Sequence, residues 1–397
     1  MRNGIDRLLG RPGVVLMLFL ASLAMGWHGY DLLWCALSGA PFHPAFGVNL
    51  RTTQYFFNYQ DLGFIKRGLV GTMLHPFPAL TTRVGLALVG WALLLVFALQ
   101  FWSFFLAATA SVAGRGRGIL ALLCAATPAF LLRLGNDFGR FDVIDLMAAL
   151  ACFSLLWRSR WFLASIPAAL AILVHEDFLF FQLPLIVALA ATLPGDGKRK
   201  PWLSLLALPA AATAAVFLWG RSRLGLDPLI GYFAHNPRYL AAVPGGQVQV
   251  EEVAVLARTL RDNFALNGRM FAQKLAWLHL PVILAWFWFA GRHAAHFYRR
   301  NGLAKDLLFY AAFCPLLLGL VGFDYYRWVA MAAVNLLLVI LLQCRRRAEA
   351  GVDPVIDWDG SAKVLTASAL LGPIGNTKSF LYLFLFLHQV SPWSFNW

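Results

Sequence analysis

The chain has 397 residues, of which 60% are hydrophobic, 15% aromatic and only 13% charged. Soluble domains carry about 25% charged residues, so this composition excludes a soluble enzyme, a nucleic-acid-binding module and a disordered scaffold. Together with the mean hydropathy of +0.67, it predicts an all-α, polytopic membrane helix bundle. Five scattered cysteines show no metal-ligand spacing, so they predict neither a metal centre nor a disulfide framework.

Apolar runs of about the length needed to span a bilayer recur along the whole chain. We expect about ten spans, at residues 14–34, 84–108, 118–134, 143–157, 161–174, 178–193, 202–219, 275–290, 307–321 and 328–342. A shorter run at 380–387 is either an eleventh span or a re-entrant segment. Residues 1–343 therefore form the membrane-embedded bundle, and residues 344–397 form a C-terminal tail.

The distribution of basic residues predicts the orientation of these spans. With the N-terminus in the cytoplasm, seventeen basic residues lie on the cytoplasmic side. The short outside connections hold only three, Arg133, Arg140 and Arg327. The net charge of +14 is thus largely an orientation signal. The two long segments 35–83 and 220–274 then face outward, and 250–266 reads as an amphipathic helix in the second of them.

Charged residues collect in the connections predicted to lie outside. Such residues at membrane depth are expensive and are functional candidates by default. Because they lie on one side only, we expect them to surround one polar cavity that opens outward. They are Asp31 at the end of the first span, Asp61, Lys66 and Arg67 in the first long connection, Asp137, Arg140 and Asp142 near residue 140, His175, Glu176 and Asp177 in the HED turn, and Asp324 and Arg327 in GFDYYRW.

Each motif also has a purely structural interpretation. Asp137 and Asp142 could cap the helix that follows them, and the HED turn could be a hydrated hairpin tip. Asp324 and Arg327, three residues apart, could form a local ion pair.

A carboxylate beside cations in a membrane cavity suits group transfer from a phosphorylated lipid. An aspartate can accept the proton of an attacking hydroxyl, while arginine and lysine bind phosphate oxygens. The catalytic candidates are Asp61, with Asp31 and Glu176 as alternatives. The candidates for binding the lipid phosphate are Lys66, Arg67, Arg140, Arg327 and His175, supported by Asp137, Asp142, Asp177 and Asp324. No motif predicts a cofactor, and the sequence leaves open whether the protein uses a divalent cation.

This plan resembles the GT-C glycosyltransferase superfamily in its many spans, its acid in the first outer loop (Asp61) and its second long outer loop. The short turns GRFD and DYYRW also resemble those of EpsG-like and Wzy-like polysaccharide polymerases. The resemblance covers the general plan of about 340 residues rather than an aligned motif, and Asp61 lacks the adjacent second acid of the common GT-C loop motif.

The resemblance implies an inner-membrane enzyme that transfers sugar from a polyprenyl-phosphate or polyprenyl-diphosphate carrier to a glycan or lipid acceptor. Its active site would face the periplasm, and it would serve the synthesis of cell-envelope or exopolysaccharide glycan. The alternative is a secondary transporter or flippase of a lipid-linked or anionic substrate, and a structural subunit of an envelope complex is a third class. None of these three classes predicts a nucleic-acid partner.

Overall fold

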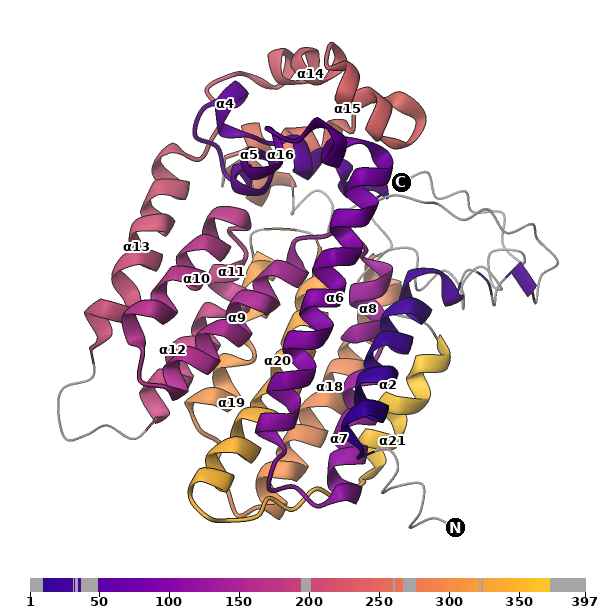
Figure 1. Ribbon diagram of the computed structural model, residues 1–397, viewed down its shortest axis with the longest axis vertical. Helices are drawn as coiled ribbons and strands as arrows, with labels where there is room; N and C mark the ends of the chain where they lie inside the picture. The colour runs from indigo at the N-terminus through magenta and orange to yellow at the C-terminus, as the bar shows by residue number, and fades with distance from the viewer. Residues whose placement is uncertain are drawn as a thin grey trace.

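The protein is a bundle of helices with a layer of short helices over one end (Figure 1). The computed structural model describes residues 10–30, 32, 35–36, 49–193, 201–259, 261–266, 276–320, 322 and 324–371. Among these residues every regular element is helical and none is a strand. The predicted span at 380–387 and the candidate Asp31 lie outside the described residues.

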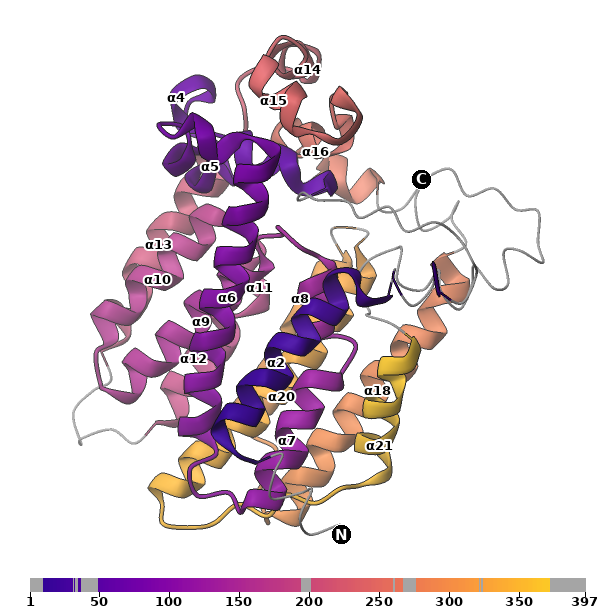
Figure 2. The ribbon, with the colours of Figure 1, turned by 45° about the vertical axis from the view of Figure 1, so that its right-hand side comes forward.

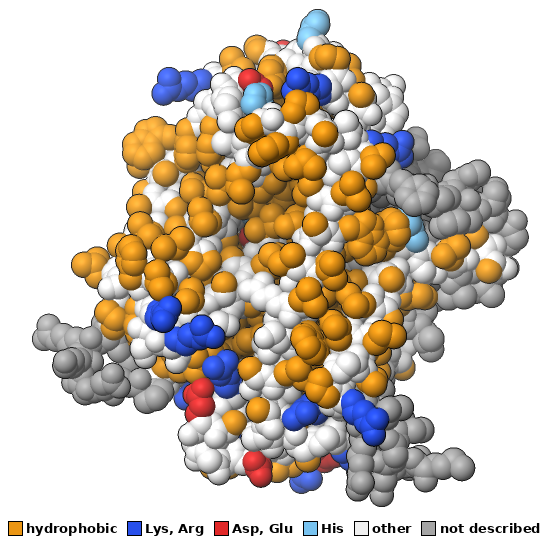
Figure 3. Space-filling view, in the orientation of Figure 1, with side chains coloured by type: hydrophobic (Ala, Val, Ile, Leu, Met, Phe, Trp, Pro, Cys, Tyr) orange, Lys and Arg blue, Asp and Glu red, His pale blue; other side chains and the backbone are white. Residues whose placement is uncertain are grey.

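Five helical segments of the described chain are long and apolar enough to cross a membrane, in agreement with the prediction of a helical membrane bundle. They are Pro12–Gly29 (α2 and η1), Arg83–Ala108 (α6), Gly114–Asn136 (α7 and α8), Trp202–Trp219 (α13) and Tyr325–Glu349 (α20). Shorter apolar segments are Trp161–Val174 (α10), Phe178–Thr192 (α11 and α12) and Leu307–Leu320 (α19 and η5). Figure 3 shows hydrophobic side chains over the middle of the visible face, with basic side chains gathered toward its lower end.

Several predicted spans are divided into two helical segments in the structure. The sequence did not predict these divisions, because average hydropathy does not register breaks in backbone hydrogen bonding. The run at 118–134 becomes α7 (Gly114–Ala126) and α8 (Leu131–Asn136), separated by a turn that contains Pro128. The run at 178–193 divides at Gln182, just before Pro184, into α11 (Phe178–Phe181) and α12 (Leu183–Thr192). The run at 307–321 ends as the 3-10 segment η5 (Cys314–Leu320). Proline residues account for the interruptions in all three runs, because proline lacks the N–H that a helix needs for its hydrogen bonds.

Two other predicted spans are shorter than the helices that contain them. The helix predicted over 275–290 is part of α18 (Ala276–Arg300), and the one over 328–342 is part of α20 (Tyr325–Glu349). In both helices the added turns carry arginines, whose long apolar stems allow a helix to continue past its apolar run. The fourth span agrees closely with α9 (Asp142–Trp157), and α21 (Gly360–Ala367) packs beside α18 and α7.

The two long connections form one layer over the bundle, which we call the cap (Figures 1 and 2). Its helices are η2 (Asn49–Phe56), α4 (Tyr59–Leu62), α5 (Gly68–Leu74), η3 (Pro78–Thr81), α14 (Leu226–Ala234), α15 (Pro237–Ala242), η4 (Pro244–Gly246) and α16 (Val250–Ala257). Hydrogen bonds join the two connections, from Tyr232 to Asp61 at 2.6 Å and between Thr53 and Tyr239 at 3.1 Å. The amphipathic helix predicted over 250–266 is interrupted after Ala257, and residues 261–266 are helical again.

Helix α20 lies at the centre of the bundle, and its apolar stretch is buried throughout. It therefore delivers the side chains of its first turn to the middle of the capped end. Next to it, α8 packs against α2 and η1 (Met25–Gly29) at glycines on both sides. A Cβ atom at Gly26 would lie 2.0 Å from the Leu132 carbonyl oxygen, and one at Gly135 would lie 2.0 Å from that of Leu23. Such close contacts between backbones are typical of membrane helices, and here they fix the position of the turn that follows α8.

Candidate functional site

Arg327, in the first turn of α20, is the centre of a cluster of charged side chains at the capped end. Its Nε donates to the Asp142 oxygens at 3.0 and 3.1 Å, and its Nη1 donates to Asp177 at 2.8 Å. Its Nη2 lies 3.0 Å from His175 Nε2, and the guanidinium stacks over the Phe181 ring at 4.9 Å. One guanidinium thus joins α9, the HED turn and α20.

Asp142 is held by two arginines, because Arg133 also donates to its Oδ2. Arg133 is completely buried in α8, and its Nη2 lies 3.3 Å from the Asp137 carboxylate. The residue at the N-cap position of α9 is Phe141, whose side chain makes no capping hydrogen bond. Asp142 therefore serves as an ion-pair partner, and its interpretation as a helix cap is wrong.

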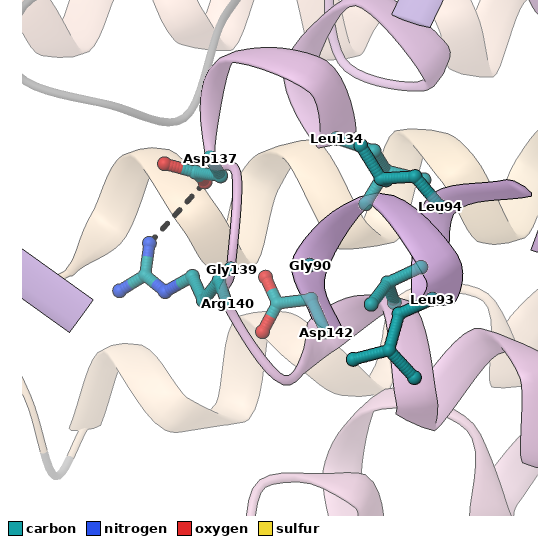
Figure 4. Close-up of a pocket in the computed structure, with 9 residues that line it drawn as sticks. Gly90, Leu93, Leu94, Leu134, Asp137, Gly139, Arg140 and Asp142 are labelled. Carbon is teal, nitrogen blue, oxygen red and sulfur yellow. Dashed lines mark hydrogen bonds and ion pairs between the residues drawn. The ribbon is translucent and has the colours of Figure 1, made fainter. Parts of the chain in front are cut away.

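Arg140 connects the GRFD turn with the DYYRW turn. Its guanidinium lies 2.6 Å from Asp324 Oδ2. It also lies 3.3 Å from Asp137 Oδ2, a contact that Figure 4 shows. The turn needs a positive φ of 84° at Gly139, whose carbonyl accepts a hydrogen bond from Tyr55 of the cap at 2.7 Å. The carboxylate of Asp324 thus pairs with Arg140, whereas the structural interpretation paired it with Arg327.

His175 forms a hydrogen bond with the deepest carboxylate of the cluster. Its Nδ1 lies 2.9 Å from Oδ2 of Asp145, which is fully buried one turn into α9. The second oxygen of Asp145 has no hydrogen-bond partner among the described residues. His175 ends α10 with an extended backbone and is 2% exposed, so the HED turn is not a hydrated tip.

Three of these groups are also near enough to one another to share a metal ion. Ligand atoms of Asp142, Asp145 and His175 all lie within 4.8 Å of one another. Two guanidinium groups already contact Asp142, however, and one of them also contacts His175. Positive charge is therefore supplied by arginine at this point, and the arrangement favours an ion-pair network over a cation site.

Glu176 and Arg67 form a bidentate pair between the bundle and the cap. Arg67 Nε and Nη2 lie 2.9 and 2.8 Å from the two Glu176 oxygens, and Lys66 Nζ lies 3.9 Å from one of them. Burial raises the pKa of Glu176, but the charges of Arg67 and Lys66 outweigh it and hold that pKa below its usual range. A carboxylate held in this way is a weak proton acceptor, so Glu176 fits the positioning of Arg67 better than the predicted catalytic role.

Asp61 lies in the cap and does not join the cluster by any hydrogen bond or ion pair that the described residues show. Its Oδ2 accepts hydrogen bonds from Tyr232 at 2.6 Å and from Asn58 at 3.0 Å, and His75 lies 3.8 Å away. Burial raises the pKa of Asp61, but these hydrogen bonds and His75 together lower it by more than burial raises it. The pKa of Asp61 therefore lies below its usual value. Its side chain is 35% exposed, so it is an ionised and accessible carboxylate.

The structure brings together most of the predicted residues. A cavity of about 10 Å³, room for roughly one water molecule, lies beside Asp137, Arg140 and Asp142 (Figure 4). The side chains expected to line an open polar cavity contact one another through ion pairs, and this void beside them is small. Arg133 and Asp145 were not among the predicted site residues, although both are charged residues at the edge of an apolar run, which is the signal that identified the others.

Comparison with known proteins adds no assignment: no family model, curated protein or solved structure matches this chain.

Proposed function

We propose that this protein is a membrane glycosyltransferase or polysaccharide polymerase that takes sugar from a polyprenyl-phosphate or polyprenyl-diphosphate carrier at its capped end. The observation that carries the proposal is the pair of buried arginines, Arg140 and Arg327, beneath a cap that holds an ionised aspartate. Guanidinium groups bind phosphate oxygens in bidentate geometry. Buried ions are retained against a desolvation penalty of several kcal/mol each, and substrate binding gives a reason to retain them.

In the proposed reaction, a hydroxyl oxygen of the acceptor attacks the anomeric carbon of the carrier-linked sugar. A new C–O bond forms there, the bond to the phosphate oxygen breaks, and its electron pair leaves with the lipid phosphate. Asp61 accepts the hydroxyl proton, and Arg140 and Arg327 stabilise the charge that develops on the leaving phosphate. Exposed apolar side chains on the first turns of α6, such as Val84 and Leu88, provide a surface for the prenyl chain.

The roles of the other candidates follow from their partners. Asp137 and Asp142 orient the arginines, and Glu176 orients Arg67. Asp31 stays a predicted alternative base.

The experiment that tests this proposal is sugar transfer from purified lipid-linked donors by the protein in liposomes. Asp61→Asn preserves size and hydrogen bonding but removes the proton acceptor, so transfer should fall about 10²–10⁴-fold. Asp227→Asn is the matched control, because Asp227 is an exposed aspartate in the same cap, in the first turn of α14. Near-normal transfer by Asp61→Asn would exclude Asp61 as the base, and absence of transfer by the unmodified protein from every donor would contradict the enzyme class.

One observation favours proton-coupled transport as a second candidate function. Asp145 is fully buried, hydrogen-bonds His175 and has one oxygen for which the described part of the chain offers no partner. Such acid–histidine chains also relay protons in transporters. Transport predicts substrate-driven proton movement across a sealed liposome, which Asp145→Asn should abolish. Glycosyl transfer predicts no such movement.

A further inference from the structure

Each of the two proposed phosphate-binding arginines contacts two carboxylates through different nitrogen atoms. Arg327 contacts Asp142 and Arg140 contacts Asp137, whose side chains are 1% and 2% exposed. In addition, Arg327 contacts Asp177 at 2.8 Å and Arg140 contacts Asp324 at 2.6 Å. The side chains of Asp177 and Asp324 are 15% and 33% exposed. Each guanidinium therefore has an inner carboxylate partner and an outer one.

The charge of the cluster leaves no excess for an added anion. The ion pairs connect five basic residues with six acidic residues, in addition to His175: Lys66, Arg67, Arg133, Arg140 and Arg327 with Asp137, Asp142, Asp145, Glu176, Asp177 and Asp324. A phosphate added to this set would meet like charge at short range, which is unfavourable where solvent screening is weak. Binding of a phosphate thus requires that carboxylates leave the arginines.

The outer carboxylates are the two that can leave. Asp324 is the residue before α20 and Asp177 is the residue before α11, and neither side chain caps its helix. Movement of these two side chains therefore removes no helix cap. His175, which lies 3.4 Å from Asp177, keeps its hydrogen bond with Asp145 when Asp177 moves. Asp142 and Asp137, in contrast, lie inside the bundle against Arg133 as well, so their departure would leave a second buried guanidinium without its partner.

We propose that Asp177 and Asp324 are exchangeable occupants of a two-arginine phosphate site, and that the phosphate group of a polyprenyl carrier replaces them on Arg327 and Arg140. Asp142 and Asp137 keep their contacts during the exchange and hold the guanidinium groups in place. This inference rests on the proposed function for the identity of the ligand. It adds which sides of the arginines bind the phosphate and which residues compete with it.

The proposal makes a signed prediction that a structural ion pair does not make. Removal of a competing carboxylate raises the fraction of protein that is ready to bind, so it should strengthen phosphate binding. From the usual range for partly exposed ion pairs, Asp177→Asn and Asp324→Asn should each lower the Kd for undecaprenyl phosphate about two- to fivefold. If the two aspartates instead orient the arginines for the ligand, the same substitutions should weaken binding.

The test measures undecaprenyl phosphate binding to the full chain in phosphatidylcholine nanodiscs. Asp357→Asn is the control for loss of one negative charge, because Asp357 pairs with Arg300 on α18, outside the cluster, and is also partly exposed. Arg140→Lys and Arg327→Lys should weaken binding, since lysine lacks the bidentate geometry. A parallel titration with inorganic pyrophosphate separates a lipid-linked phosphate from a free one: tighter binding of the lipid alone supports the carrier, and tighter binding of pyrophosphate alone excludes it.

Unchanged or weaker binding in both Asp177→Asn and Asp324→Asn, at an unaltered melting temperature, would overturn the exchange. Lack of binding by every variant would overturn it as well. Because the Asp324 side chain is 33% exposed and that of Asp177 only 15%, Asp324→Asn should fold even if Asp177→Asn does not, and it then decides alone. Sugar transfer is measured on the same samples: tighter binding without any transfer would contradict the proposed enzyme activity, while transfer without tighter binding would contradict only the exchange.

Discussion

The two ends of the helix bundle both contain ion pairs, but they differ in how deeply the charges are buried. At the capped end, the Arg327 and Asp142 side chains are 5% and 1% exposed. At the opposite end, the Arg300 and Asp357 side chains are 53% and 48% exposed. Removing two ions from water costs several kcal/mol per ion, whereas an exposed pair contributes about 0–1 kcal/mol.

The difference in burial indicates that the charged residues at the two ends serve different purposes. The pairs at the end opposite the cap involve arginines in the last turns of α18 and α20, such as Arg300 and Arg346. There they suit the retention of basic residues on one side of a membrane and contact with its interface. The cluster at the capped end has no such explanation, because its charges are enclosed by apolar helices. We attribute its retention to the proposed ligand.

The largest expected effect is the loss of Arg327. Arg327→Ala leaves Asp177 without its arginine and Asp142 with Arg133 alone, and breaking a buried pair from one side costs about 3–5 kcal/mol. The measurement is the free energy of unfolding in detergent. Arg300→Ala at the opposite end should cost no more than about 1 kcal/mol, and equal losses in the two variants would remove the distinction between the ends.

The sequence allowed the gathering of charge at one end to be predicted, but not its packing. The GRFD and DYYRW turns do meet, through Arg140 and Asp324, and the argument depended only on counting charges on alternate sides of the spans. Asp61 was placed with them because it lies in a connection on the same side. The cap, however, pairs it with Tyr232, from a loop about 170 residues further along the chain, and no local pattern specifies that contact.

The same limit explains Arg133 and the divided helices. Arg133 was counted as a residue of an outer turn, whereas α8 ends further along the chain and buries it against Asp142. Hydropathy averages identify an apolar run but not the turn between α7 and α8. Its position depends on which backbone N–H groups find partners, so the depth of Arg133 in the bundle follows from tertiary structure.

Glu176→Gln should have a smaller effect, because the arginine that loses its bidentate partner is Arg67, which is partly exposed, whereas Arg327 is buried at the centre of the cluster. We expect a loss of about 2–3 kcal/mol of unfolding free energy at pH 7. The pKa of Glu176 is lowered in the folded protein, so its contribution is fully present above the unfolded pKa of about 4.3. It is lost as the pH falls toward the folded pKa.

The difference between Glu176→Gln and the unmodified protein should therefore be constant from pH 7 to about pH 5 and then narrow in acid. Glu251→Gln provides the matched control, since Glu251 pairs with Arg258 in the cap but its side chain is 83% exposed. That variant should change stability by less than about 1 kcal/mol at any of these pH values. A difference for Glu176→Gln that grows in acid would contradict the lowered pKa.

Tyr232→Phe should have the smallest effect on stability. It tests whether the contribution of a charged side chain to stability depends on its burial or on its position at the capped end. Asp61 lies at the capped end, but it is about as exposed as many surface carboxylates, so loss of one hydrogen bond to it should cost only about 0.5–1 kcal/mol. The Tyr232 hydroxyl lowers the pKa of Asp61, and its removal should raise that pKa.

Because a base must be ionised, the acid side of the pH profile for sugar transfer by Tyr232→Phe should move to higher pH, while the rate at neutral pH changes little. Tyr310→Phe, at an exposed tyrosine on α19, should leave the profile in place; a profile that Tyr232→Phe also leaves in place would mean that Asp61 is not the group whose ionisation limits transfer.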